Sequence, residues 1–235
     1  MADSDNIDGI PVIRDAFPRT VRLVTTARLR ASVLKALAET EQELADIAEI
    51  EGFTSNRLIA QDHGIDGVAA EELIYKVPHS IFINAAFSYA KPGELSRFSD
   101  SSRGAWYAAL AVETSLAEVA FHMTEFLSRT GVFEAVVDYG ELFASLAGEY
   151  ADLRERKSHP ALGVDTAAAY PAGNALASAV RAKGANGIVY FSVRHPGGTC
   201  FAVLWPHAVQ SVAQGSVYRL TWKGSQNPKI EKVAG

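Results

Sequence analysis

The sequence has little cysteine and no long apolar run, and each shortage excludes a class of protein. Cys200 is the single cysteine among 235 residues, which excludes a disulfide within the chain and a zinc site built from several cysteines. It lies in an apolar stretch, so we expect a buried, unreactive thiol. No apolar run approaches the ~20 residues that span a bilayer. The polar, acidic start MADSDNIDG lacks the basic and apolar segments of a secretion signal. We therefore expect a soluble cytoplasmic protein that does not associate with a membrane.

Several enzyme motifs are missing as well. The sequence contains no G-x-G-x-x-G, G-x-x-x-x-G-K-[ST], H-E-x-x-H or G-x-S-x-G, which argues against the dinucleotide-binding, P-loop, zinc protease and serine hydrolase classes. The six histidines are not at metal-ligand spacing, so we expect no metal. A net charge of −5 gives no electrostatic support for direct binding of nucleic acid. A few local arginines can still bind the phosphate of a small molecule on an acidic protein.

The pattern along the chain predicts one α+β domain. Apolar residues make up 48% of the sequence, enough for a sizeable core. Strands are predicted at 20–26, 106–112, 133–139 and 216–222, with two more in 187–206 joined at Pro196–Gly198. Helices are predicted at 30–51 and 114–129, and the segment 170–187 holds a further helix capped by Gly184. Strands outnumber helices and short turns join several of them, which favours mixed or antiparallel sheets with flanking helices.

The predicted domain covers residues 20–222. We expect a polar N-terminal segment at 1–19 and a loose tail at 223–235. The irregular stretch 53–95 suggests an insertion or a lid whose role is open.

Glu118 is the sharpest candidate for chemistry, and it has a structural alternative. Ser115 and Glu118 have the spacing of a capping box, in which the carboxylate satisfies the start of a helix. Glu118 also shares a helical face with His122, Glu125 and Arg129, as on a solvated surface. A carboxylate near a helix start beside a sheet can instead point into a cleft, where it opposes positive charge developing on a sugar ring.

Three arginines are candidates for phosphate binding. Arg97 and Arg103 flank a polar loop, RFSDSSRG, and guanidinium donors match phosphate oxygens. The structural alternative is an ordinary exposed loop. Arg22 lies in an apolar strand, where its side chain points either to solvent or into a site.

Tyr107 and Ser192 complete the candidates. Tyr107, next to Trp106, is either a core residue or a stacking surface for a ring. Ser192 ends the apolar run GIVYF and shares a face with Tyr190 and Arg194 by strand alternation. A serine at such a place is commonly a turn or cap residue.

Together, Arg22, Arg97, Glu118 and Ser192 resemble the signature of the RES domain family, which is named for arginine, glutamate and serine. The surrounding blocks VRLV, SRF followed by GAWYAA, ETSLAEVAFH and GIVYFSVRHPGGTCFAVLWP occur in family order over residues 20–206. The resemblance implies a fold like that of ADP-ribosyltransferases and a toxin of a bacterial toxin–antitoxin pair, neutralised by an Xre-type antitoxin. It also implies an enzyme that consumes NAD as a substrate without a metal.

The resemblance also implies a role for each matched residue. Arg22 and Arg97 would grip the diphosphate or ribose of NAD, and Tyr107 would pack against nicotinamide or its ribose. Ser192 would hold a site arginine or the nicotinamide end. Glu118 would stabilise the oxocarbenium-like transition state as nicotinamide leaves.

Several alternatives stay open at this point. Glu113 competes with Glu118 for the catalytic role, and Arg103 competes with Arg97, because the family often has Gly-Arg-Trp where this chain has Ser96, Arg97 and Phe98. The ADP-ribose acceptor is a protein, for which a phosphoribosyl pyrophosphate synthetase is one kind of target implied, or else water or phosphate. A different class of function is a module that binds a nucleotide or an antitoxin without turnover.

Overall fold

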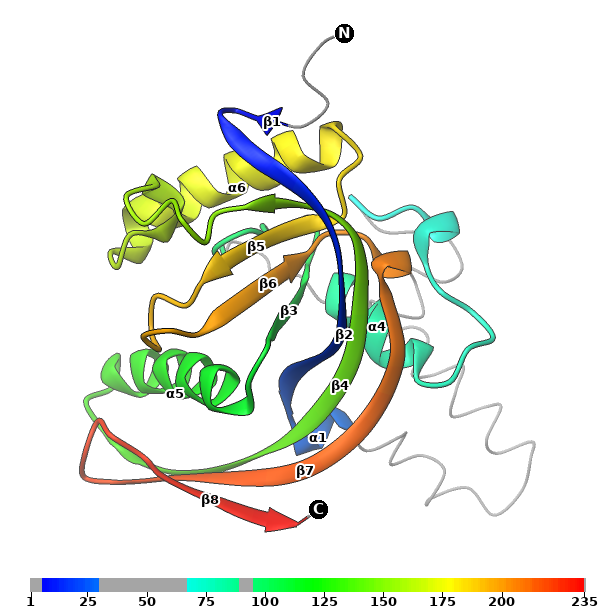
Figure 1. The fold of residues 1–235 in the computed structure, drawn as a ribbon. Coiled ribbons are helices and arrows are strands. Elements are labelled where there is room, and N and C mark those ends of the chain that lie inside the picture. The colour runs from blue at the N-terminus through cyan, green and yellow to red at the C-terminus, as the bar shows by residue number, and fades with distance from the viewer. Residues whose placement is uncertain (1–5, 30–66, 89–94, 235) are drawn as a thin grey trace, which may run out of the picture.

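A single curved sheet organises the fold in the computed structural model, which describes residues 6–29, 67–88 and 95–234 (Figure 1). The strands are β1 (Asn6–Ile7), β2 (Ile10–Thr25), β3 (Trp106–Ala109), β4 (Glu134–Asp152), β5 (Gly187–Phe191), β6 (Thr199–Val203), β7 (Val209–Lys223) and β8 (Lys229–Ala234). In the described residues they follow the order β1-β2-β3-β6-β5-β4-β7-β8, and β2 also pairs with β4. The β4–β5 pair is parallel and the other pairs are antiparallel. The expected α+β fold with a mixed sheet is confirmed.

The described helices are α1 (Thr26–Leu29), α4 (Ser80–Ser88), α5 (Val112–Ser128) and α6 (Thr166–Ala182), with single 3₁₀ turns η2 (Ala70–Glu72), η3 (Pro160–Leu162) and η4 (Pro206–Ala208). The predictions for α5 and α6 are confirmed to within a few residues. The side chain of Asp165 caps the start of α6 by accepting from the Ala167 N–H. Gly184 follows its end at φ +76°, a conformation that favours glycine. The helix predicted over 30–51 lies outside the described residues.

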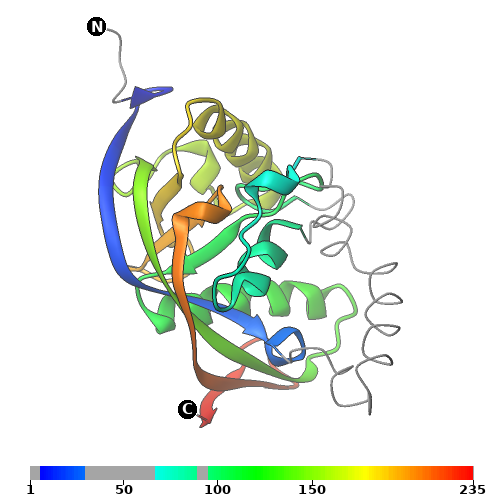
Figure 2. The same ribbon diagram turned by 90° about the vertical axis from the view of Figure 1, so that its right-hand side faces the viewer.

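The helices cover different parts of the sheet. Helix α6 packs on β3, β5 and β6, where Leu176, Ala177 and Val180 meet Ile188 and Ala202 in one apolar cluster. Helix α5 lies in the curve of β2, β4 and β7, and α4 packs near β3 and β7 (Figures 1 and 2). The turn of the β5–β6 hairpin lies beside α5 at one end of the sheet (Figure 1).

The two ends of the chain differ from the expectation. The polar segment at 1–19 includes β1 and most of β2, which pairs with β4 from Val12 onward. The tail after Trp222 is not loose throughout, because Lys229–Ala234 pairs with β7 as β8. Part of the irregular stretch 53–95 forms η2 and α4. No helix in the described part of the chain is long and apolar enough to cross a membrane.

Candidate active site

Glu118 does not cap its helix. Helix α5 begins at Val112 after an N-cap at Ala111, so the capping-box interpretation of Ser115 and Glu118 is wrong. The Ser115 hydroxyl instead donates to the Val21 carbonyl oxygen at 2.8 Å and ties the helix to β2. Glu118 lies near the end of the second turn with a half-buried side chain. Its carboxylate is therefore available for contacts outside its own helix.

The partner of Glu118 is Ser192, in the loop that joins β5 to β6. The Ser192 side chain is buried, and its hydroxyl donates to Glu118 Oε1 at 2.7 Å. Ser192 Oγ also accepts hydrogen bonds from the backbone N–H groups of Arg194 and His195, at 3.2 and 2.9 Å. Because these two donors occupy the acceptor side of the hydroxyl, its proton is directed at the carboxylate. Glu118 Oε1 also lies 3.8 Å from Cys200 Sγ, whereas Oε2 accepts no hydrogen bond from a described residue.

Three contacts fasten this loop along one face of α5. Thr114 Oγ1 lies 2.9 Å from His195 Nδ1, Glu118 accepts from Ser192, and the Arg194 guanidinium lies 3.5 Å from the centre of the Phe121 ring. The helix residues are at positions i, i+4 and i+7, which project from the same side of a helix. The pairing of helix and loop is thus repeated over two turns, and the Glu118–Ser192 contact is at its middle.

Arg97 is held against the link between η3 and α6. It is 8% exposed, and its Nη1 donates to the carbonyl oxygens of Ala161 and Gly163 at 2.6 and 3.2 Å. Its guanidinium also lies 5.5 Å from the centre of the Tyr170 ring on α6. Arg194 reaches the same connection from the other side, where its Nη2 donates to the Val164 carbonyl oxygen at 3.3 Å. Both arginines hold the short link between η3 and α6.

The charges of Arg97 and Glu118 act on a common set of groups. Burial is the largest influence on each: it lowers the pKa of Arg194 and of His122, and it raises the pKa of Tyr170. The carboxylate of Glu118 raises the pKa of all three groups, and the guanidinium of Arg97 lowers it. Residues from α5, α6, the 95–103 loop and the β5–β6 loop therefore share one electrostatic environment.

Comparison with known proteins identifies the family. The family model described as the RES domain matches residues 73–223. This chain belongs to the RES domain family. The matched range contains Arg97, Tyr107, Glu118 and Ser192, and Arg22 lies before it.

Two individual proteins are also similar to this RES protein. An uncharacterized protein, y4oC of Sinorhizobium fredii, is 26% identical over 215 residues, covering 91% of this chain and 86% of that protein. Among solved structures, a chain of the M. tuberculosis MbcT–MbcA toxin–antitoxin complex aligns over 89% of this chain and 87% of its own length. That alignment has a TM-score of 0.42 and 13% identity.

Tyr107 lies within the RES domain core. Its side chain points to the α6 side of β3, where the hydroxyl accepts from the Phe98 N–H at 2.9 Å and lies 3.0 Å from Ser99 Oγ. Burial raises the pKa of Tyr107 to about 12. The tyrosine thereby holds the loop that carries Arg97, so its visible contacts are those of a positioning residue.

Arg22 is not brought together with Glu118. Its Nη1 donates to the Tyr107 carbonyl oxygen at 3.1 Å, and its guanidinium lies 5.0 Å from the Trp106 ring centre. Trp106 and Tyr107 are adjacent in β3 and point to opposite faces of the sheet. Arg22 thus lies on the Trp106 face, where β2 and β3 diverge after their single paired position, Val21 with Ala109. Burial, and next the charge of Arg28, lower the pKa of Arg22 to about 10.

The structure also places the two rival residues of this RES domain. Glu113 is exposed in the first turn of α5. Arg103 is buried, and its donors are directed to Gly67 O at 2.6 Å, Glu72 Oε2 at 2.5 Å and Leu204 O at 2.8 Å. These contacts give Arg103 a structural role in joining η2 to the end of β6.

Sequence reasoning missed two residues of the site. Arg194 follows Ser192 by two positions, and strand alternation marks it only as a polar side chain on the same face. Its proximity to Phe121 cannot be inferred from spacing. Tyr170 gave no sequence signal, because an aromatic near a helix start is usual in a core. Both become site residues through the packing of α6 and the β5–β6 loop.

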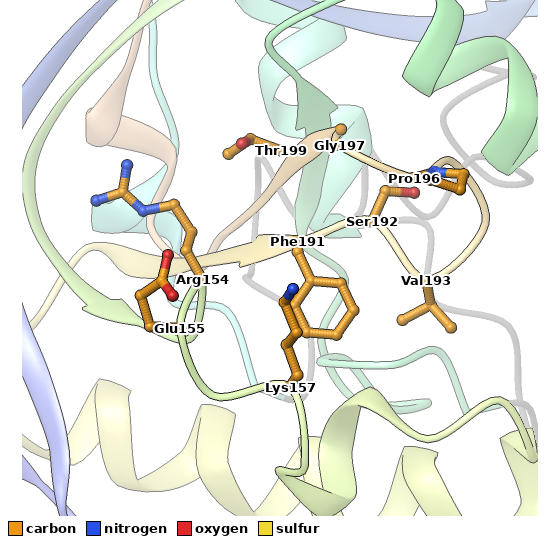
Figure 3. Close-up of a pocket in the computed structure, with 10 residues that line it drawn as sticks. Arg154, Glu155, Lys157, Phe191, Ser192, Val193, Pro196, Gly197 and Thr199 are labelled. Carbon is orange, nitrogen blue, oxygen red and sulfur yellow. The ribbon is translucent and has the colours of Figure 1, made fainter.

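Ser192 also borders an open pocket of about 480 Å³ (Figure 3). Its walls come from the loop after β4, with Arg154 and Lys157, and from the end of β5 and the β5–β6 loop, with Phe191 and Pro196. Arg154 is already paired with Asp152 through two hydrogen bonds, at 2.9 and 2.7 Å. Among the described residues, no group of three or more His, Cys, Asp and Glu could hold a metal ion.

Proposed function

We propose that this RES protein cleaves the nicotinamide–ribose bond of NAD and transfers the ADP-ribosyl group to an acceptor. The observation that carries the proposal is the half-buried Glu118 carboxylate, with one oxygen held by Ser192 at 2.7 Å and the other accepting no hydrogen bond from a described residue. Such a carboxylate suits a reaction in which positive charge develops on a sugar ring. Membership in the RES domain family supports the choice of NAD as substrate.

In the proposed reaction the C1′–N bond of the nicotinamide riboside half breaks and its electron pair leaves with nicotinamide. Nicotinamide departs as a neutral molecule, because its ring nitrogen is positively charged in NAD, and no acid is needed to protonate it. Glu118 Oε2 stabilises the oxocarbenium-like ribose. The acceptor then forms a new bond to C1′ and loses its proton. The contribution of the protein is a fixed carboxylate and a fixed substrate.

The remaining candidate residues are proposed to hold the substrate. Arg97 binds the diphosphate or ribose of NAD, and Tyr107 acts on the same site through the loop that it anchors. Arg22 contacts the Tyr107 carbonyl from the other face of β3, so we propose that its effect on NAD is indirect. These roles, including that of Ser192 in catalysis, stay predictions.

The proposed biological role is that of a toxin in a type II toxin–antitoxin system. A protein acceptor, such as a phosphoribosyl pyrophosphate synthetase, is the first choice, and an Xre-type antitoxin is the proposed neutralising partner. The alternative is that water or phosphate accepts the ADP-ribosyl group, so that the enzyme depletes NAD. The cytoplasmic location stays a prediction.

The test is to incubate purified, partner-free protein with NAD labelled in the adenylate, in water, in phosphate or with cell extract. We expect nicotinamide release in at least one sample; label on a protein band supports transfer to protein, and label only in small molecules supports NAD degradation. The variant Glu118→Gln should release nicotinamide about 10²–10³-fold more slowly. Glu113→Gln, the exposed carboxylate on the same helix, is the matched control and should retain activity. Equal rates for Glu118→Gln and the parent protein would remove Glu118 from the mechanism.

A further inference from the structure

Two arginines at the candidate site, Arg97 and Arg194, act on each other electrostatically. Within the described part of the chain, Arg14, Arg103, Arg154 and Arg219 each lie within 2.7 Å of a carboxylate oxygen. Arg97 and Arg194 form no ion pair with a described residue. They are near enough that, after burial, the charge of Arg97 is the next largest cause lowering the pKa of Arg194. The charges of Glu118 and Glu125 oppose this effect of Arg97 without forming an ion pair with Arg194. An anion that contacts both guanidinium groups would therefore relieve their repulsion further.

Arg194 is the more available of the two. Its guanidinium lies 3.5 Å from the centre of the Phe121 ring, a contact made through the flat face of the group. Stacking leaves the N–H donors at the edge of the guanidinium directed away from the ring. In the described structure those donors make one hydrogen bond, to Val164 O at 3.3 Å, which is long for a charged donor. Arg97, by contrast, has a contact of 2.6 Å to Ala161 O in a buried setting.

The geometry points to Arg194 as a binding residue for the diphosphate of the ADP-ribosyl donor, acting beside Arg97. On binding, phosphate oxygens replace the Val164 carbonyl as the acceptor for Arg194. This inference rests on the proposed function and adds to it a specific residue and a place for the anionic half of the substrate. It puts the diphosphate on the Glu118 side of β3, not on the Trp106 side where Arg22 lies.

The arrangement accounts for selection of a diphosphate-linked ribose. Ser192 and Arg194 belong to one short loop, and the Ser192 hydroxyl accepts from the Arg194 N–H at 3.2 Å. The residue that fixes Glu118 and the residue that binds phosphate are thus held by the same backbone. A substrate whose diphosphate contacts Arg194 would have its position relative to Glu118 restricted by that backbone, which is the condition for using binding energy at the reacting bond.

The experiment measures ADP-ribose binding by titration calorimetry for the parent protein and for Arg194→Gln, Arg194→Lys and Arg219→Gln. Arg194→Gln loses one charge-assisted contact with phosphate, so its Kd for ADP-ribose should be about tenfold to a hundredfold higher than that of the parent protein. The lysine variant keeps the charge but not the flat, forked donors, so its loss should be smaller. Arg219→Gln removes an arginine paired with Asp138 on the β4–β7 surface and should bind as the parent does. Thermal melts check that each variant is folded.

A second measurement separates phosphate binding from a purely structural role. Nicotinamide riboside has the reacting bond but no diphosphate, so the ratio of kcat/KM for NAD to that for nicotinamide riboside should fall about tenfold or more in Arg194→Gln. Equal losses on both substrates would mean that Arg194 only supports the loop, and the inference would be overturned.

The two proposals fail in different ways. If the parent protein binds ADP-ribose through Arg194 but releases no nicotinamide, the proposed reaction is wrong and the binding residue stands. If the parent protein releases nicotinamide and Arg194→Gln binds ADP-ribose as tightly as the parent, the inference about Arg194 is wrong. Absence of ADP-ribose binding by the parent protein would also overturn it.

Discussion

At the scale of single residues, the hydroxyl of Ser192 has three hydrogen-bond partners on two different elements. It accepts from two backbone N–H groups of its own loop and donates to Glu118 on α5. The carboxylate therefore depends on the loop for its orientation, and the loop depends on the hydroxyl for its shape. Removing one oxygen atom should disturb both.

We predict that Ser192→Ala lowers kcat about tenfold with a smaller change in KM, because Glu118 loses a charge-assisted hydrogen bond that fixes it. The melting temperature should also fall, since the N–H groups of Arg194 and His195 lose their acceptor. Nicotinamide release and a thermal melt provide the two measurements. Ser128→Ala, at the end of α5, removes an exposed hydroxyl that bonds its own helix, and it should change neither. An unchanged kcat for Ser192→Ala would show that Glu118 is positioned without it.

The same scale shows what the sequence could predict about the site. The sequence pattern picked out the four signature residues by type and order, and three of them, all but Arg22, lie on the α6 side of β3. The pattern misassigned Ser115 as a cap because the spacing of Ser115 and Glu118 fits a capping box whatever precedes it. Helix α5 starts at Val112 because the backbone at Ala111, just after β3, is still extended. That extended conformation depends on the sheet, which the local spacing of Ser115 and Glu118 does not report.

At the scale of elements, the sequence pattern predicts where strands occur but not how long they are. The prediction of 133–139 covers only the first part of β4, which continues to Asp152. The register of β4 with β7 shifts between Gly140 and Leu142 and again between Phe143 and Ser145. Each shift interrupts the two-residue alternation that marks a strand in a sequence. Long curved strands with bulges therefore give a shorter signal than their real length.

Helix α6 shows how one element positions the site without contacting substrate. At Gly173, in the middle of this helix, an added Cβ would lie 1.9 Å from the Arg97 carbonyl oxygen and 3.3 Å from the Phe98 ring. The helix thus approaches the Arg97 loop so closely that only glycine fits. Packing of this kind fixes the position of Arg97 more tightly than its own hydrogen bonds alone would.

We predict that Gly173→Ala destabilises the protein and weakens ADP-ribose binding together. At an exposed helix position, replacing glycine by alanine stabilises a protein by about 0.5–1 kcal/mol. At Gly173 we expect the opposite effect, a lower melting temperature. The reason is that the methyl group pushes the Arg97 loop away from α6. Ser178→Ala, at an exposed position of the same helix, is the control and should leave both quantities near those of the parent protein. A Gly173→Ala variant with unchanged melting temperature would contradict the close approach.

At the scale of the whole molecule, the site lies where separately formed parts meet. Strands β2, β3, β6, β5 and β4 pair in this order, and β4 also pairs with β2, so that these five strands form a closed ring of pairings. The residues of the site come from chain positions as far apart as 97 and 194, brought together by this arrangement. Composition and periodicity could predict the class of fold, but not which ends of these strands would be neighbours. That neighbourhood is set by the register of pairs such as Tyr150 with Gly187.

Arg103 joins further parts of the molecule, since it links the η2 turn to the end of β6. Its ion pair with Glu72 is mostly buried, with side-chain exposures of 6% and 23%. Burial raises the pKa of Glu72, but the hydrogen bonds from Arg103 and the Ala69 N–H and the charges of Arg103 and His207 together lower it more. The net pKa of Glu72 therefore lies below its ordinary value. A carboxyl with a lowered pKa in the folded protein stabilises the fold above its unfolded pKa, and this contribution is lost as the pH falls through the folded value.

We therefore predict that Glu72→Gln lowers the free energy of unfolding by about 1–3 kcal/mol at pH 7, because Arg103 stays buried without its counter-charge. The difference from the parent protein should shrink as the pH falls through the lowered pKa of Glu72, where this carboxylate becomes protonated and its pair with Arg103 is lost. Urea unfolding at pH 7 and pH 3 measures both differences, with Glu71→Gln, an exposed neighbour, as the control. A difference that stayed constant with pH would mean that the Glu72 side chain acts through its shape and not its charge, and that the η2 turn is held by the other two bonds of Arg103.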